Sequence, residues 1–293
     1  MTAATPPPPP PPPPPSRSVP PSGSVASGAA ASARPPVPPP PGGPGPGGER
    51  VPRRPLSSWA AFVVLYRTLL RSVRTTARLA CLSVFGLLTV ALAALAASSD
   101  GGTSLGRGLD QASAGLSQAV ALGALVLASA VLGELYDNGS IVYLALRPVS
   151  SRVLAAAGWA AAATWCLPLG LVAAGSVVAV HSGDGLAGAS LLAAVLAVAA
   201  YVALFGFLGV LVKRALPVGL AFLVLWEGVV AQVGKAGSAL TVTGYLRSLL
   251  ARLTDHPLEH AELSLATAVV GPIAATVLFV LLTARVLDRR ELP

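Results

Sequence analysis

The chain has 293 residues, of which 54% are hydrophobic and only 11% are charged, with a mean hydropathy of +0.71. Soluble domains carry about 25% charged residues, so this composition excludes most soluble globular enzymes and indicates a protein that crosses a membrane several times. The net charge of +8 comes from basic residues that flank apolar runs, and this placement argues against nucleic-acid binding.

Residues 1–55 form a tail rich in proline, glycine and serine. They contain most of the chain's 28 prolines, including the unbroken run Pro6–Pro15. Such a segment cannot bury a core, so we expect a disordered tail with polyproline character. The tail also lacks the regions of a signal peptide. A ligand for proline-binding domains is the functional alternative.

Residues 56–77, with the sequence LSSWAAFVVLYRTLLRSVRTTA, predict an amphipathic helix whose start Ser57 or Ser58 can cap. A stripe of arginines recurs at i, i+4, i+7 and i+11 of one continuous helix, and aromatic and aliphatic residues cover most of the other side. Arginines on such a helix meet anionic headgroups at a membrane surface. The candidate membrane-surface residues are therefore Trp59, Arg67, Arg71, Arg74 and Arg78. An ordinary first span with basic flanks is the alternative.

Six apolar runs follow, and each has about the length that a membrane-spanning helix needs. They are Leu79–Ala97, Ala114–Gly133, Val153–Val180, Leu186–Val212, Ala215–Val233 and Leu263–Ala284. The predicted fold is an all-α membrane protein in which an amphipathic interfacial elbow helix precedes six transmembrane helices. Residues 56–293 form its single membrane domain.

The basic residues predict the orientation of these spans. Six spans place both termini on the same side, and all but four of the 20 Lys and Arg residues fall on that side. The four exceptions are Arg107, Lys235, Arg247 and Arg252. The positive-inside rule then makes both termini cytoplasmic, in a multi-pass protein of the plasma membrane. The many Ala, Gly, Pro and Arg residues indicate a bacterial source.

The connection over residues 134–152 is the most informative stretch. Asn138-Gly139-Ser140 predicts a turn, Ile141–Leu146 predicts a short apolar helix, and Pro148 ends that helix at Arg147. A routine loop does not need an exposed apolar turn in the cytosol, so this helix predicts a partner surface.

This stretch resembles the cytoplasmic connection in permease subunits of type-2 ATP-binding-cassette exporters. The matching features are Glu134, Gly139-Ser140, the apolar helix Ile141–Leu146 and Arg147-Pro148-Val149-Ser150. The elbow helix, the six spans and the basic C-terminal end extend the resemblance from about Leu56 to the C-terminus. One departure is Gly158-Trp159, where the family often has Gly-Lys, and it leaves the subfamily and the substrate open.

The resemblance implies a coupling segment, an ATPase partner and a dimer. The short helix would couple to a separate cytoplasmic ATPase subunit through Glu134, Asp137, Gly139, Ile141, Leu144, Leu146, Arg147 and Pro148. Six spans are half of a family transporter, so we expect a homodimer or a second permease subunit. The chain has no phosphate-binding loop, because its single Gly-Lys pair, Gly234-Lys235, lacks the rest of the motif. We therefore expect a transport subunit without catalytic residues or a bound cofactor, with ATP and Mg on the partner.

Glu227 is the acidic residue that lies deep in a predicted span. A carboxylate in hydrocarbon is costly, so it should face protein or water. It can serve as a pathway residue, a proton acceptor or a dimer contact, or it can only fix packing through an internal hydrogen bond. The first role would fit an ion-coupled secondary transporter, which is one alternative to the exporter; a non-transporting membrane scaffold is another.

The segment over residues 232–262 is the largest extracytoplasmic feature. Asp255 and Pro257 predict the start of a short helix there. The sequence His256–His260 also matches the H-x-x-E-H pattern of some zinc peptidases. A zinc site needs a third protein ligand, and none follows at suitable spacing, so we expect no metal site. A re-entrant or surface helix that seals the outer mouth is the favoured interpretation.

Deletion of residues 1–55 is expected to leave membrane insertion intact, because this tail contains no apolar run. The measurements are the membrane yield of the truncated chain and the amount of ATPase that copurifies with it. Loss of both relative to the full chain would contradict the prediction.

Overall fold

The computed structural model describes residues 57–100, 105–137, 150–181, 183–212, 214–230, 236–237, 239–258, 261 and 263–290. The chain divides into two units, Met1–Arg53 and Arg54–Pro293, and every described residue belongs to the second. All regular structure in these residues is helical, as the all-α prediction requires. The predicted tail over 1–55 lies outside the described residues.

Helices follow one another along almost the whole described chain. They are α1 (Ser58–Val73), α2 (Thr76–Asp100), α3 (Leu105–Gly115), the π-helix η1 (Leu116–Val120), α4 (Ala121–Asp137), α6 (Ser151–Val180), α7 (Leu186–Leu211), α8 (Ala215–Phe222), the π-helix η2 (Leu223–Val229), α10 (Val242–Leu253) and α11 (Leu265–Arg290). The segments α3–η1–α4 and α8–η2 are each one continuous helix, because no residue separates their parts. We call each of these continuous helices a rod. Both therefore carry a π-helical stretch inside a longer helix.

Five helical stretches have the length and apolar composition of membrane-spanning helices, so the described chain has the character of a membrane-embedded protein. They are Thr76–Leu95, Gly108–Val131, Ser151–Val180, Leu186–Leu211 and Leu265–Arg289. Five of the six predicted spans overlap them. The described part of the remaining run contains a shorter apolar helix over Ala215–Val229, which corresponds to about 22 Å at 1.5 Å per residue. This helix is shorter than a usual span, and the count of six stays a prediction.

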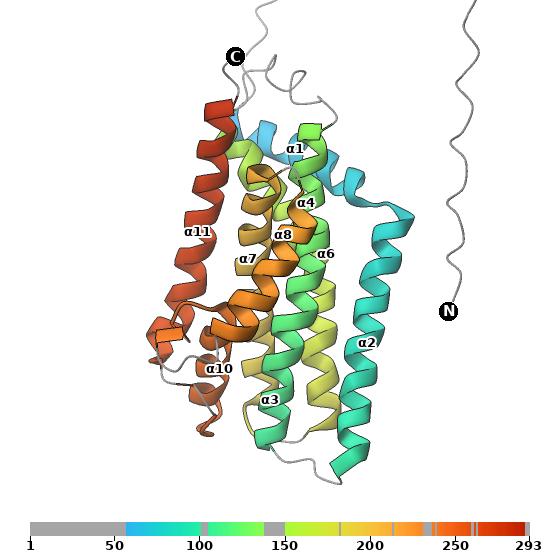
Figure 1. Ribbon diagram of the computed structural model, residues 1–293, viewed down its shortest axis with the longest axis vertical. Coiled ribbons are helices and arrows are strands. Elements are labelled where there is room, and N and C mark those ends of the chain that lie inside the picture. The colour runs from blue at the N-terminus through green and yellow to red at the C-terminus, as the bar shows by residue number, and fades with distance from the viewer. Residues whose placement is uncertain are drawn as a thin grey trace, which may run out of the picture. The chain divides into compact units, whose positions relative to one another are not determined.

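The long helices run side by side, and α1 lies across one end of them (Figure 1). We call this end the α1 end; the first turn of α6 and the last turn of α11 also lie there. At the opposite end, the α10 end, lie α10 and the connection from α6 to α7. The rod α8–η2 descends from the α1 end beside α4 and stops near α10.

Helix α7 forms the centre of the bundle, where it packs against α4, α6 and α11. Its buried face is rich in alanine and glycine, and small residues of this kind let apolar helices approach closely. At Gly209 an added Cβ would lie 2.8 Å from the Cα of Ser129 in α4 and 3.0 Å from its carbonyl oxygen. The two backbones are therefore in contact at this point, and no side chain can yield there.

Replacing Gly209 with valine is expected to lower the free energy of unfolding by about 1–3 kcal/mol, because overpacking must push α7 away from α4. The matched control is Gly175→Val, since an added Cβ at Gly175 meets no atom within 4 Å. Thermal unfolding in detergent should show a lower midpoint for the Gly209 variant and an unchanged midpoint for the control. Equal midpoints for the two variants would contradict the packing described here.

Helix α1 lies where the elbow helix is predicted, but it ends earlier than the sequence indicated, and its place at the membrane surface stays a prediction. Helix α1 stops at Val73, and Arg74 and Thr75 separate it from α2. The prediction of one arginine stripe on a continuous helix was therefore wrong, because Arg78 belongs to α2. The run Val73–Thr76 contains three β-branched residues, which lower helix propensity, and the chain turns there from lying across the bundle to running along it (Figure 1).

Candidate functional site

Helix α1 is attached to α6 along one face. Its Ser57 cap accepts a hydrogen bond from the backbone N–H of Ala60, as one of the two predicted caps would. The Tyr66 hydroxyl lies 3.0 Å from the Thr164 Oγ1, and the Trp165 indole N–H donates to the carbonyl of Leu70 at 3.1 Å. These bonds hold α1 across the bundle.

Four of the five predicted membrane-surface residues are exposed on α1 or at its end. Arg67 and Arg71 are exposed on the helix, and Arg74 is its exposed C-cap. Trp59 is 72% exposed although its ring stacks on Phe62 at 5.5 Å. Arg78 is half-buried in the first turn of α2. The structure thus brings four of the five residues together on α1 and separates the fifth.

Most of the predicted coupling segment lies outside the described residues. Glu134 and Asp137 belong to the last turns of α4, and their side chains are not described. The predicted residues outside the described part are Gly139, Ile141, Leu144, Leu146, Arg147 and Pro148. The helices that flank the segment are described, and both meet it at the α1 end (Figure 1).

One hydrogen bond joins the start of α6 to the end of α11. Ser150 occupies the N-cap position of α6, and the next residue, Ser151, is buried. The Ser151 hydroxyl donates to a carboxylate oxygen of Asp288, which lies in the last turn of α11. A movement of the chain just before α6 would therefore act on α11 as well.

Glu227 lies in η2 and caps the first turn of α10. One carboxylate oxygen accepts the backbone N–H of Val242 at 3.0 Å; the other accepts the N–H of Thr243 at 3.1 Å and its hydroxyl at 2.6 Å. Thr241 accepts the next N–H, from Gly244, at 3.2 Å. Three of the four N–H groups left free at a helix start are thereby bonded, and the carboxylate also faces the positive end of the helix dipole.

A groove of about 430 Å³, open to its surroundings, runs between η1, η2 and α10. Its polar lining residues are Ser117, Gln118, Glu227, Thr243 and Arg247, and its apolar ones include Leu122, Leu220, Leu223 and Val224. Both π-helices of the described chain thus contribute to one groove. Short π-helices inside α-helices are rare and occur frequently at functional sites, so this groove is the candidate functional site.

The polar and apolar residues of the groove lie at different levels. The rods α3–η1–α4 and α8–η2 run in opposite directions beside each other (Figure 1). A rise of 1.5 Å per residue places Glu227 about 10 Å closer to the α10 end than Leu220, and Gln118 about 6 Å closer to it than Leu122. The groove is therefore polar towards the α10 end and apolar towards the middle of the bundle.

Two polar groups in this region lack partners among the described residues. The Nε atom of Arg247 is buried and makes no hydrogen bond, although the residue lines the groove. Tyr201 of α7 places a fully buried hydroxyl close to Glu227 and Thr243, but no hydrogen bond of ordinary geometry joins this hydroxyl to either side chain. Unbonded buried donors are rare in folded proteins, so the region holds spare capacity for polar contacts.

The sequence interpretation found Glu227 but missed most of the groove. The sequence interpretation used Arg247 only as one of the four basic residues on the extracytoplasmic side. It treated Gln118 as part of the apolar run Ala114–Gly133. A signal was present for Gln118, because a long amide in the middle of a predicted span is unusual. No signal in the sequence marks the two π-helices.

The helix in the segment 232–262 lies before Asp255, not after it. Helix α10 ends at Leu253, Asp255 adopts a positive φ of 48°, and residues 256–258 are not helical. The prediction that Asp255 caps a short helix was therefore wrong. The helix of this segment, α10, is capped by Thr241. Helix α10 packs against α11, α7 and α3.

The H-x-x-E-H match is only partly described, since Glu259 and His260 lie outside the described residues. His256 lies against Gly106 of α3, where an added Cβ would meet its Nε2 atom at 2.7 Å. The chain has one further histidine, His181, whose Nε2 atom lies 2.8 Å from the amide oxygen of Gln111. No set of three His, Cys, Asp or Glu side chains that suits a metal occurs in the described part.

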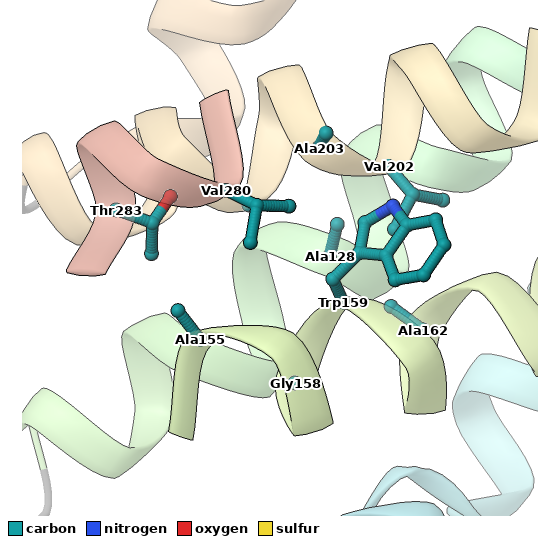
Figure 2. Close-up of a pocket in the computed structure, with 10 residues that line it drawn as sticks. Ala128, Ala155, Gly158, Trp159, Ala162, Val202, Ala203, Val280 and Thr283 are labelled. Carbon is teal, nitrogen blue, oxygen red and sulfur yellow. The ribbon is translucent and has the colours of Figure 1, made fainter. Parts of the chain in front are cut away.

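The departure at Gly158-Trp159 has a packing role. Trp159 lines a narrow crevice between α4, α6, α7 and α11, together with alanines such as Ala155 and Ala203 (Figure 2). Its indole N–H donates to the carbonyl of Ala199 in α7 at 3.2 Å. The aromatic ring therefore joins α6 to the central helix at a position where the family often carries a lysine.

Comparison with known proteins adds no relative. No protein-family model matches the chain, and no curated protein matches it. The expected exporter family rests on the residues of the segment 134–152 and on the order of the apolar runs.

Proposed function

We propose that this chain is the permease subunit of an ATP-driven exporter that moves an amphiphilic, drug-like or lipid-like substrate by alternating access. The observation that carries the proposal is the attachment of the segment between α4 and α6. Both flanking helices meet it at the α1 end, and Ser151 links its far end to Asp288 of α11. A force on this segment would reach α4, α6 and α11 together, which is what a coupling element requires.

The membrane orientation belongs to the same proposal. The α1 end faces the cytoplasm of a bacterial cell, where the exposed arginines of α1 contact anionic headgroups. Both termini are then cytoplasmic, and the rod α8–η2 is a short fifth span among six. The groove opens in the outer half of the membrane, next to α10.

Partners and cofactors follow from the resemblance. A separate cytoplasmic ATP-binding-cassette ATPase binds the coupling residues and holds ATP and Mg, while this chain has no catalytic role. A second permease copy or a sister subunit completes the transporter. Exposed apolar side chains on α2, α8 and α11, such as Leu87, Leu216 and Val270, are available to lipid and to that second subunit.

Secondary transport through Glu227 is the weaker candidate. An ion-coupled carboxylate needs oxygens that are free to bind the ion, whereas both oxygens of Glu227 accept hydrogen bonds from α10. This arrangement favours a role in holding η2 and α10 together. The scaffold alternative has no described contact in its favour.

The test is purification of the full chain from its native membrane in a mild detergent. A protein with a phosphate-binding loop should copurify in a fixed ratio, and the complex should hydrolyse ATP. A chain that purifies without such a protein, from membranes in which a neighbouring ATPase gene is expressed, would contradict the proposal.

A further inference from the structure

We infer that the groove between η1, η2 and α10 binds an anionic amphiphile, with its acidic head at Arg247 and its apolar chain along Leu220, Leu223 and Val224. As a statement about transported cargo, this inference rests on the proposed function. As a statement about binding, it rests only on the geometry of the groove.

The division of the groove into two levels calls for a ligand with two parts. The apolar level lies towards the middle of the bundle and the polar level towards the α10 end, about 10 Å apart along η2 as Leu220 and Glu227 mark it. The cavity volume of about 430 Å³ lies within the range of ordinary small-molecule sites. A polar head with one apolar chain matches this shape.

The sign of the head follows from which charges are already satisfied. The Glu227 carboxylate accepts three hydrogen bonds and lies at the positive end of α10, so both of its oxygens are already occupied within the protein. Arg247 has no ion pair among the described residues, and its buried Nε makes no hydrogen bond. Arg247 is therefore the charged side chain of the groove with an unused donor, which favours an anionic head.

The chemistry of arginine narrows the head to an oxyanion. A guanidinium offers several N–H donors in a plane and binds carboxylate, phosphate or sulfate oxygens in pairs. Arg247 follows Thr243 by four residues on α10, so the two side chains share one helix face and both line the groove. The acidic head of a ligand at Arg247 would therefore lie on the same face of α10 as Thr243.

The binding test uses the purified full chain in phosphatidylcholine nanodiscs without any ATPase, so that failure of binding is separate from failure of ATP coupling. The probes are dodecanoate, dodecyl phosphate and dodecyltrimethylammonium, each competing with a fluorescent carboxylate of similar length. The anionic probes should bind at least about tenfold more tightly than the cationic probe. Equal or tighter binding of the cation would overturn the inference.

Variants assign the binding to the groove. Arg247→Gln should weaken dodecanoate binding at least about tenfold, and Arg247→Lys should retain part of it. The matched control is Arg252→Gln on the same helix, because Arg252 is exposed and its Nε donates to the carbonyl of Leu263 instead of facing the groove. Similar effects of Arg247→Gln and Arg252→Gln would overturn the assignment. Thermal unfolding reports whether each variant folds.

A second variant tests the apolar level independently of the charge. Leu223→Trp fills that level, so it should weaken dodecanoate much more than octanoate. An unchanged preference for the longer chain would overturn the placement of the apolar part. Nanodiscs with phosphatidylglycerol separate the sources of the acidic head: competition with dodecanoate identifies a lipid headgroup as the occupant, and unchanged binding identifies a free amphiphile.

Discussion

Replacing Leu144 with aspartate is expected to weaken the complex with the partner ATPase by at least a factor of ten. The sequence places Leu144 in a short apolar helix that should be buried against the partner, and burial of such a side chain is worth about 1.5–3 kcal/mol. Aspartate would lose this contribution and would bury an unpaired charge at the contact. A change of about 1.4 kcal/mol already corresponds to tenfold in affinity.

The measurements for this variant are ATPase copurification and substrate-stimulated ATP hydrolysis, with membrane level as the control for insertion. Leu240→Asp provides a matched substitution, because Leu240 is 62% exposed and belongs to the segment that leads into α10. We expect the Leu144 variant to insert normally and to lose the partner, and the Leu240 variant to keep it. Normal binding and stimulation in the Leu144 variant would show that the segment is not the coupling element.

Replacing Glu227 with lysine is expected to separate η2 from α10, whereas glutamine should be tolerated better. Glutamine keeps one acceptor oxygen but presents an N–H₂ group where the second oxygen stood, so a loss of about 1–3 kcal/mol in the free energy of unfolding is expected. Lysine keeps no acceptor and brings a positive charge to the positive end of α10. Its effect should therefore be at least about twice as large.

Thermal unfolding of the purified variants measures this difference. The matched pair is Asp110→Gln and Asp110→Lys, since Asp110 is an exposed carboxylate in α3. Both of these should unfold close to the unchanged protein. If Glu227→Gln unfolds normally but abolishes transport, Glu227 acts as an ionised functional group, and the packing role is contradicted.

The spans could be predicted because they depend on length and hydrophobicity alone. Five of the predicted runs overlap the apolar helices of the structure. The boundary at Val73 could not be predicted in the same way. It depends on where the chain changes direction between α1 and α2.

The candidate site was predictable only in part, because it depends on how helices pack. The sequence marks Glu227 as unusual by its depth, but it does not reveal the hydrogen bonds to Val242 and Thr243, which depend on how η2 packs against α10. Arg247 carries no local signal, since arginine in an outer loop is common. Its significance comes from its placement in the groove and from the lack of a partner for its Nε atom.

Site-specific photo-crosslinking from position 144 tests the central claim most directly, because it identifies what this segment touches in the native membrane. A photoreactive residue replaces Leu144 in one variant and Leu240 in a second, and mass spectrometry identifies the products. The account predicts that position 144 crosslinks to a protein with a phosphate-binding loop and that position 240 does not. Absence of such a product at position 144, or the same products at both positions, would contradict the assignment of this chain as the permease of an ATP-driven exporter.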